Sequence, residues 1–347
     1  MSTLLVATAL FLAFSNGAND NFKGFATSWG SGVLSYKAAL ILSNLATLAG
    51  GIVSIIIADG LIKQFSGRGL VDDALAASSA FSFAVAAGAG LTLMLATRFG
   101  FPISTTHALV GGLTGAGMVS NSAVEWAALG RGFMLPLLVS PVLSATLAFT
   151  IYGTAKLMQR RMLPNHTGVS TISDDGGEEA NDKPLTMMHI LSGGAICFAR
   201  AVNDTPKLAA LMLGAGILLP VNSALAATIA MVAGGWLLSR RVAETMSHKI
   251  SDISPSQGTT ANLITATLVL TASKFSLPVS TTHVSVGAII GSGQAAGRLD
   301  LSTVRNVLLS WVVTLPLSAA LTALFGVLLQ KWMALGIELP RFVGGQW

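Results

Sequence analysis

Long apolar runs separated by short polar stretches dominate this chain. Seven runs are long enough, or nearly so, for a helix to cross a bilayer, which takes about 20 residues. They cover residues 1–16, 38–58, 77–97, 132–155, 208–238, 259–273 and 303–330. The 208–238 run exceeds one crossing and contains Pro220, which predicts two helices that meet at this proline.

Four further stretches are apolar but rich in Gly, Ser and Thr. They cover residues 17–36, 100–120, 191–206 and 276–297. They are too polar for simple crossings and too apolar for solvent-exposed loops. Irregular backbone is tolerated at membrane depth only where protein or a water-filled cavity covers it. The four stretches therefore predict broken helices or re-entrant hairpins.

A polar stretch at residues 156–186 divides the chain near its middle. It predicts a first transmembrane repeat at 1–155, a linker, and a second transmembrane repeat at 187–347. Basic residues directly after an apolar run favour the cytoplasmic side. The linker begins with three of them: Lys156, Arg160 and Arg161. No cleavable signal peptide is expected, because the N-terminal apolar run lacks a basic start.

The composition narrows the class of protein further. Hydrophobic residues make up 52% of the chain and charged residues 10%, against about 25% charged in soluble domains. This excludes a soluble enzyme, a nucleic-acid-binding protein and a disordered chain. The net charge of +5 fits basic cytoplasmic loops. We expect a multi-pass protein of the plasma or bacterial inner membrane, whose small residues would also suit a homodimer.

Charged residues inside the membrane are costly, so they are functional candidates by default. Eight lie in or beside apolar segments: Asp20, Lys23, Lys37, Arg98, Arg200, Asp204, Lys207 and Lys274. We expect Arg98 and Lys274 to extend toward an interface. Arg200 has Asn16 at the matching place of the first half, and its role is left open.

The two halves repeat each other. Residues 98–117 and 274–293 are identical at 10 of 20 positions without a gap. The Asn-Asp-x-x-Lys motif at 19–23 recurs at 203–207. Duplicated membrane halves with interrupted segments indicate a secondary transporter that binds substrate between the repeats. We therefore predict an all-α polytopic protein with two inverted repeats, broken helices or re-entrant hairpins, and roughly 10–12 membrane segments.

A hydroxyl triplet stands in each half, as Pro-x-Ser-Thr-Thr-His. Proline suits a first helical turn and Ser or Thr suits the cap, so both motifs predict helix starts. Free N–H groups and the positive end of a helix bind oxyanions. The candidate substrate ligands are Ser104, Thr105, Thr106, Ser280, Thr281 and Thr282. The alternative is that these hydroxyls only cap the helices or bond the backbone.

The repeated Asn-Asp motifs offer oxygen ligands for Na⁺ or a carboxylate that carries a proton. These candidates are Asn19, Asp20, Asn203 and Asp204. Lys23 and Lys207 stand three residues after each aspartate, so an ion pair along the helix is the alternative. His107 and His283 follow the hydroxyl triplets. We expect them to support the hairpins rather than to carry protons.

Motifs for ATP binding, for hydrolysis and for metal binding are not found in the sequence. The chain has no phosphate-binding loop for ATP and no nucleophile elbow around Ser104 or Ser280. Its single cysteine and scattered histidines predict no metal site, and no cofactor is expected beyond bound Na⁺. Three alternatives stay open: a sulfate or related oxyanion permease, a passive channel and, more remotely, an intramembrane hydrolase using Ser104, His107 and Asp20.

These motifs resemble the inorganic phosphate transporter (PiT) family of sodium- or proton-coupled permeases. The resemblance rests on Gly17-Ala-Asn-Asp20, on Thr27-Ser-Trp-Gly-Ser-Gly32 and on both copies of Pro-x-Ser-Thr-Thr-His. It covers both halves and leaves out the linker. It implies inverted repeats that bind phosphate and cations between them, without enzymatic activity.

The departures from the family pattern are informative. The family ends its motif in Asn, where this chain has Lys23 and Lys207. It also carries a glutamate in each half, at positions that ungapped matching assigns to Thr47 and Asn262. We hypothesise that the two ammonium groups replace bound Na⁺ beside the anion. Under this hypothesis transport would be Na⁺-independent, and either proton-coupled or tuned to a dianion such as sulfate. Without it, we expect secondary active transport of phosphate coupled to H⁺ or Na⁺.

Overall fold

The computed structural model describes residues 2–57, 59–120, 122–162, 182–213 and 218–335, which are helical apart from loops and two isolated bridges. Ten of these helices have 15 residues or more. In the first half they are α1 (Ser2–Asp20), α3 (Tyr36–Ile57), α6 (Ser79–Phe99), α7 (Thr105–Val119) and α9 (Leu135–Met162). In the second half they are α11 (Lys183–Leu213), α12 (Pro220–Leu238), α14 (Pro255–Lys274), α15 (Thr281–Ala296) and α16 (Leu301–Ala334).

Short helices connect the long ones. In the first half they are η1 (Lys23–Phe25), α2 (Ala26–Gly30), α4 (Asp59–Phe65), α5 (Asp73–Ala76), α8 (Trp126–Leu129) and the π-helical turn η2 (Gly130–Met134). The second half has α13 (Arg240–His248). Within the described ranges, six segments are apolar and long enough to cross a membrane: α3, α6, α8 to α9, α11, α12 and α16. The expected all-α multi-pass architecture is confirmed.

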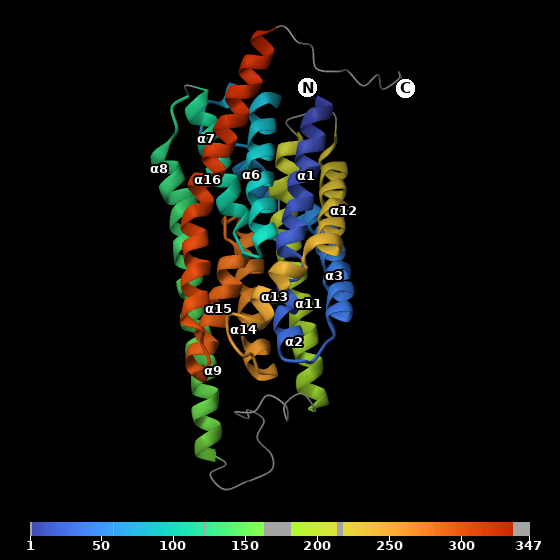
Figure 1. Ribbon diagram of the computed structural model, residues 1–347, viewed down its shortest axis with the longest axis vertical. Coiled ribbons are helices and arrows are strands. Elements are labelled where there is room, and N and C mark those ends of the chain that lie inside the picture. Colours follow the sequence, from blue (N-terminus) through green and yellow to red (C-terminus); the bar gives the residue numbers. More distant parts are fainter. Residues whose placement is uncertain (1, 58, 121, 163–181, 214–217, 336–347) are drawn as a thin grey trace.

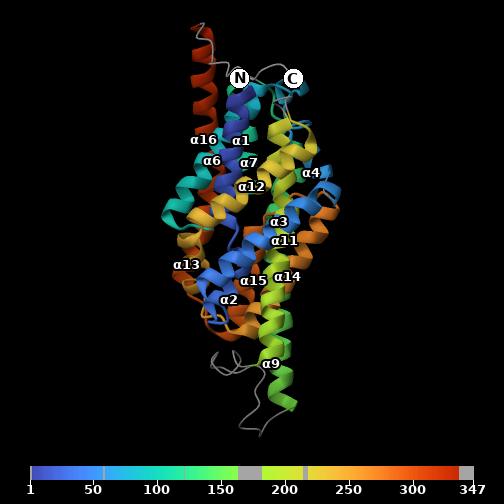
Figure 2. The same ribbon diagram turned by 90° about the vertical axis from the view of Figure 1, so that its right-hand side faces the viewer.

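The two halves run in opposite directions (Figure 1). Helix α1 starts at the top of the view, whereas α11 starts near the bottom. Helix α9 ends lowest and α16 ends highest, and Figure 2 shows the same from the side. The α6–α7 pair enters from above and turns back at mid-height, while the α14–α15 pair does so from below. The expected inverted repeats with re-entrant hairpins are therefore present.

Helix packing repeats with the same symmetry. Helix α1 packs on α6 and α12, and its counterpart α11 packs on α14 and α3. Glycines allow two equivalent close approaches. A Cβ on Gly234 would lie 1.9 Å from the carbonyl oxygen of Phe14, and one on Gly50 would lie 2.3 Å from that of Phe198. Position 184 residues on from Phe14 is Phe198, and from Gly50 it is Gly234, so duplication preserved the contact.

Two expectations about helix boundaries meet different outcomes. The 208–238 run does divide into two helices, because α11 ends at Leu213 and α12 begins at Pro220. The expected break at 191–206 is wrong, since α11 is continuous there. Pro206 removes one helix hydrogen bond, whereas a break in the helix would leave several backbone groups unpaired where residues 199–212 are buried.

The two ends of the predicted linker are helical. Residues 156–162 extend α9, and 183–186 form the first turn of α11. Residues 163–181 lie outside the described ranges. The assignment of the linker to the cytoplasm therefore stays a prediction.

Candidate oxyanion site between the hairpin tips

The tips of the two hairpins have matching backbone conformations. Each turns through one residue in the left-handed region, Gly100 at φ 74° and Ser276 at φ 56°. Helix α7 begins at Thr105 and α15 at Thr281, each one residue after a serine. The expectation that proline occupies the first helical turn is wrong: Pro102 lies two residues before the cap Ser104. A cap needs a side-chain acceptor, which proline lacks.

The two serines act as helix caps in this conformation. Ser104 Oγ accepts a hydrogen bond from the His107 N–H at 3.1 Å, and Ser280 Oγ accepts one from the His283 N–H at 3.2 Å. This is the structural alternative foreseen for these hydroxyls. The free donors of each helix start are the N–H groups of its first residues, Thr105 and Thr281 among them.

Threonines join one tip to the other. Thr106 Oγ1 donates to the carbonyl of Val279 at 3.0 Å. Thr282 Oγ1 donates to the carbonyl of Ile103 at 2.8 Å. Each hairpin thus satisfies a backbone oxygen of the other, and the interface between the repeats passes between the tips.

Lys23 lies in a shell of oxygens at this interface. Its ammonium donates to the Asp20 carboxylate, to the hydroxyl of Thr282, to Asn19 Oδ1 at 3.3 Å and to the carbonyl of Ile103 at 3.2 Å. The expected ion pair along the helix is present. Because Thr282 belongs to the second half, the lysine also links the two repeats.

Lys207 repeats this arrangement from the other side. Its ammonium lies 3.3 Å from Asp204 Oδ1, 2.9 Å from Thr106 Oγ1 and 3.1 Å from the carbonyl of Val279. Its own partner Asp204 is again three residues away, and Thr106 comes from the first half. The two lysine sites are therefore equivalent under the inverted repeat.

Asn19 and Asn203 tether the motifs to the hairpins. Asn19 Nδ2 donates to Thr97 Oγ1 at 2.9 Å, and Asn203 Oδ1 accepts from Ser273 Oγ at 3.2 Å. Thr97 and Ser273 occupy the same place in the two hairpins. Asn203 Nδ2 also reaches Thr281 Oγ1 at 3.5 Å. The amides thus hold the hairpins against α1 and α11.

Asn16 joins the two aspartates at the centre. Its Nδ2 lies 3.4 Å from Asp20 Oδ2, 3.1 Å from Asp204 Oδ2 and 2.8 Å from Thr105 Oγ1. Thr105 in turn donates to Asp20 Oδ2 at 3.1 Å. One amide on α1 therefore connects both carboxylates with the start of α7.

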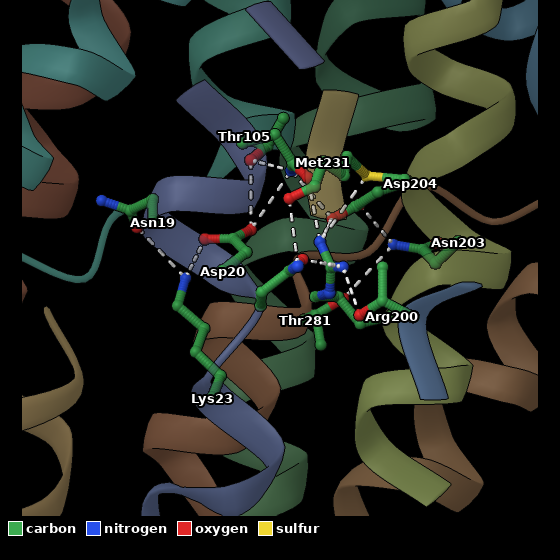
Figure 3. Close-up of polar contacts among 12 residues, drawn as sticks. Asn19, Asp20, Lys23, Thr105, Arg200, Asn203, Asp204, Met231 and Thr281 are labelled. Carbon is green, nitrogen blue, oxygen red and sulfur yellow. Dashed lines mark hydrogen bonds and ion pairs between the residues drawn. The ribbon is translucent and has the colours of Figure 1, made fainter. Parts of the chain in front are cut away.

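Arg200 completes the centre and is the residue that sequence reasoning left without a role. Its Nη1 donates to Asn16 Oδ1 at 2.9 Å, and its Nη2 donates to Asn21 Oδ1 and, at 3.0 Å, to Thr47 Oγ1. The available signal was its mismatch with Asn16, which proves to be its direct partner. In Figure 3 its side chain reaches between Asp20 on one side and Asp204 on the other.

Five ionisable side chains thus meet at mid-height, each at most 2% exposed. They are the cations Lys23, Lys207 and Arg200 and the carboxylates Asp20 and Asp204. With every group ionised, this centre carries a formal charge of +1. No cluster of three or more His, Cys, Asp or Glu side chains that would suit a metal ion occurs in the described part of the chain.

The two positions matched to family glutamates lie at different places. Thr47 contacts the guanidinium of Arg200. Asn262 is further along α14, where Thr27 donates to its Oδ1 at 3.1 Å and its Nδ2 donates to Ser192 at 3.2 Å. Of the four departures from the family pattern, the two lysines and Thr47 therefore belong to the network at the tips.

The rings of the two histidines contact each other and Trp311. The rings of His107 and His283 meet edge to face with centroids 4.5 Å apart, and His283 stacks on Trp311 at 3.8 Å. Trp311 Nε1 donates to the carbonyl of Pro102 at 3.2 Å. The rings therefore pack the hairpins together, and Ser104 is occupied as a cap, so a Ser-His-Asp hydrolase constellation is absent from these residues.

Both basic residues near the hairpin turns, Arg98 and Lys274, are exposed. Arg98 accepts a hydrogen bond through its backbone carbonyl from Arg241 of α13. Neither side chain takes part in the central network as described. This agrees with the expectation that they extend outward.

The fold and site together define a polytopic helical membrane protein built from two inverted repeats around a polar centre. Comparison of the sequence with protein families then gives its identity. The chain belongs to the phosphate transporter family, whose model matches residues 16–322. The family consists of transporters and not of enzymes, so the resemblance stated from the motifs is confirmed.

Similar proteins agree with this assignment. A putative phosphate permease of Haemophilus influenzae is 28% identical over 89% of this chain and 92% of its own length. The chloroplastic inorganic phosphate transporter 2-1 of Arabidopsis thaliana is 26% identical over 93% of this chain and 71% of its own. The solved structure described as the sodium-dependent phosphate transporter shares the fold, with a TM-score of 0.79, 22% identity, and coverage of 95% of this chain and 99% of that one.

Proposed function

We propose that this protein carries inorganic phosphate across the membrane by alternating access, with Lys23 and Lys207 supplying positive charge where a sodium-coupled relative would bind Na⁺. The supporting observation is the pair of equivalent lysine sites. Each ammonium group is held by a carboxylate, a threonine hydroxyl and a backbone carbonyl. Carboxylate and carbonyl oxygens at interrupted helices are also what transporters use to hold Na⁺.

A tethered ammonium group changes the coupling. It fills an oxygen shell without being taken from solution, so the driving ion must come from elsewhere. Asp20 and Asp204 are the acidic side chains at the centre, and they are the groups that would carry a proton between the two sides. We therefore expect Na⁺-independent, proton-coupled transport.

Two features support an anion as the substrate. The centre has a formal charge of +1, and the N-termini of α7 and α15 converge on it with their threonines. In this proposal Thr105, Thr106, Thr281 and Thr282 contact the anion after the tips separate. Ser104 and Ser280 then act by holding the helix starts in shape.

Sulfate is the second candidate substrate, and a specific observation favours it. Thr47 stands at a matched glutamate position and contacts Arg200, so the centre lacks one carboxylate that would accept the O–H of a protonated phosphate. The names of the relatives refer to phosphate, which is why phosphate is placed first. Competition between labelled phosphate and unlabelled sulfate distinguishes the two.

Uptake into proteoliposomes tests the coupling. With purified protein, labelled phosphate should accumulate equally with Na⁺ or choline outside, and a proton gradient should drive it. Strict dependence on Na⁺ would overturn the proposal. The double variant Lys23→Asn/Lys207→Asn should bind phosphate at least tenfold more weakly, whereas Lys274→Asn, which removes an exposed lysine, should not. Unchanged affinity of the double variant would mean that the lysines serve only Asp20 and Asp204.

A further inference from the structure

Arg200 has a charge that the pairing of the motifs does not use. Lys23 pairs with Asp20 and Lys207 with Asp204, each within its own half. The position equivalent to Arg200 in the first half is Asn16, which is uncharged. The duplicated motifs therefore supply one carboxylate for each lysine and none for Arg200. Its Nη1 lies 3.8 Å from Asp204 Oδ2, an ion pair too long for a hydrogen bond, and Asp204 is already paired with Lys207. With three cations and two carboxylates at the centre, Arg200 is the cation without a carboxylate of its own.

The hydrogen bonds of Arg200 leave one donor over. The Nη1 group donates to Asn16 Oδ1 and, at 3.7 Å, to Met231 Sδ, and the Nη2 group donates to Asn21 and Thr47. The Nε–H is buried and has no hydrogen-bond partner among the described residues. A buried donor on a charged group is costly when it is unpaired, so it calls for a partner.

The guanidinium of Arg200 is linked through Asn16 to both half-sites. Asn16, which accepts from Arg200, also contacts Asp20, Asp204 and Thr105, the first residue of α7. The guanidinium is thus one amide side chain away from the start of α7, which is the positive end of that helix.

We propose that Arg200 is the residue that recognises the substrate oxyanion, binding one of its oxygens through the free Nε–H and balancing its charge. A guanidinium carries a permanent charge and a planar set of donors that fits tetrahedral oxyanions. The groups of the first half that bond Arg200 are neutral, so the bound anion would supply the negative charge that balances it. This inference rests on the oxyanion transport proposed above, and it applies to phosphate and to sulfate alike.

The proposal makes the site asymmetric although its scaffold is not. The two lysines sit in equivalent shells and join the repeats, whereas the anion is anchored to α11 alone. Arg200 therefore stays with the second half when the tips separate. The lysines hold the closed arrangement, and the arginine sets which anions enter it.

Equilibrium binding to the purified full-length protein tests this inference. Binding of labelled phosphate, and separately of labelled sulfate, is measured for the wild type, Arg200→Gln, Arg200→Lys and the control Arg98→Gln. Arg200→Gln should bind at least tenfold, and up to about a hundredfold, more weakly, the range expected for one lost bond between charged groups. Arg200→Lys should be intermediate, because it keeps the charge and loses the planar set. Arg98→Gln removes an exposed arginine near the hairpin turn and should bind like the wild type.

The outcomes separate this inference from the proposed function. A wild type that binds neither anion overturns both. A wild type that binds, together with a folded Arg200→Gln variant of similar affinity, overturns only the role of Arg200. Thermal unfolding checks that the variants are folded. If Arg200→Gln does not fold, a folded Arg200→Lys variant with wild-type affinity overturns the role of the guanidinium. In uptake assays the supporting result is a raised KM for the anion with a maintained maximal rate.

Discussion

The two halves of the centre share a scaffold and differ in one charge. Lys23 and Lys207 occupy matching oxygen shells, and the hairpin tips exchange matching hydrogen bonds. Three residues before the Asn-Asp motifs, however, the first half has Asn16 and the second has Arg200, and these two side chains are hydrogen-bonded to each other. Duplication therefore accounts for the architecture and for the paired lysines, while a single unmatched residue gives the centre its net charge. A centre with a net positive charge can thus arise between two duplicated halves through one substitution in one of them.

The largest loss of stability should come from replacing each of the two aspartates in turn. Asp20→Asn leaves Lys23 without its carboxylate, and loss of one partner of a buried pair costs about 3–5 kcal/mol. Asp204→Asn should cost more, because Asp204 serves both Lys207 and Arg200. The free energy of unfolding of the two variants in mixed micelles measures this order.

A double variant serves as the control for this comparison. Asp20→Asn combined with Lys23→Asn removes charge and countercharge together, so much of the stability lost in Asp20→Asn should return. Equal losses for the two single aspartate variants would show that Arg200 gains nothing from Asp204.

The next effect concerns the equivalent glycine contacts between the halves. Gly234→Ala places a methyl group 1.9 Å from the Phe14 carbonyl oxygen, and Gly50→Ala places one 2.3 Å from that of Phe198. Both must push helices apart, which we expect to cost about 1–3 kcal/mol, with Gly234→Ala the worse of the two. Unfolding temperatures of the purified variants measure it.

Gly153→Ala is the matched control, because the added Cβ would lie 3.7 Å from Ala295, an ordinary contact distance. Inside α9 this substitution should leave stability unchanged or raise it. If all three variants behaved alike, the close approach of the helices would not be what these glycines provide.

The sequence predicted most of this arrangement through its repeats. Ungapped matching of the two hairpins predicted the duplication, and the three-residue spacing of Asp20 and Lys23 indicated the ion pair as an alternative to a coupling-ion site. It did not give the continuous α11, because the cost of Pro206 depends on how fully neighbouring helices cover that segment. Nor did it give the links from Thr106 to Val279, since the two residues are brought together only when the hairpins pack tip to tip.

The role of Arg200 shows a different limit of sequence reasoning. Its neighbours Asn16 and Asn21 come from the end of α1 and the turn after it, and Thr47 comes from α3. Spacing along the chain carries no information about such a meeting. The mismatch between Asn16 and Arg200 was visible, but only the packing of α1 against α11 shows that the two mismatched residues are partners.

A smaller difference between the halves lies in the hairpin turns. The left-handed position is Gly100 in one and Ser276 in the other, at φ 74° and 56°. A left-handed conformation costs a residue with a Cβ about 1–2 kcal/mol. Ser276→Gly should therefore stabilise the protein and Gly100→Ala should destabilise it, each by about 1 kcal/mol. Unfolding temperatures that moved in the same direction for both variants would contradict this account.

The smallest effect on stability should come from the residues that precede the last helical segment of each half, Glu125 before α8 and Asp300 before α16. Asp300 Oδ1 accepts from the Ser302 Oγ–H at 2.6 Å and from the Ser302 and Thr303 N–H groups at 2.8 and 3.2 Å, whereas Glu125, at the start of α8, makes no cap bond. These bonds, that of the Ser302 hydroxyl first, lower the pKa of Asp300 from 3.8 to about 2. A lowered pKa means that the carboxylate stabilises the fold above about pH 4 and loses this effect as the pH falls toward 2. Asp300→Ala should thus lower the unfolding temperature at pH 7 and Glu125→Ala should not. The difference in unfolding temperature between Asp300→Ala and the wild type should narrow from pH 5 down to pH 3. A difference that stayed constant would mean that the charge of Asp300 does not contribute to the stability of this helix start.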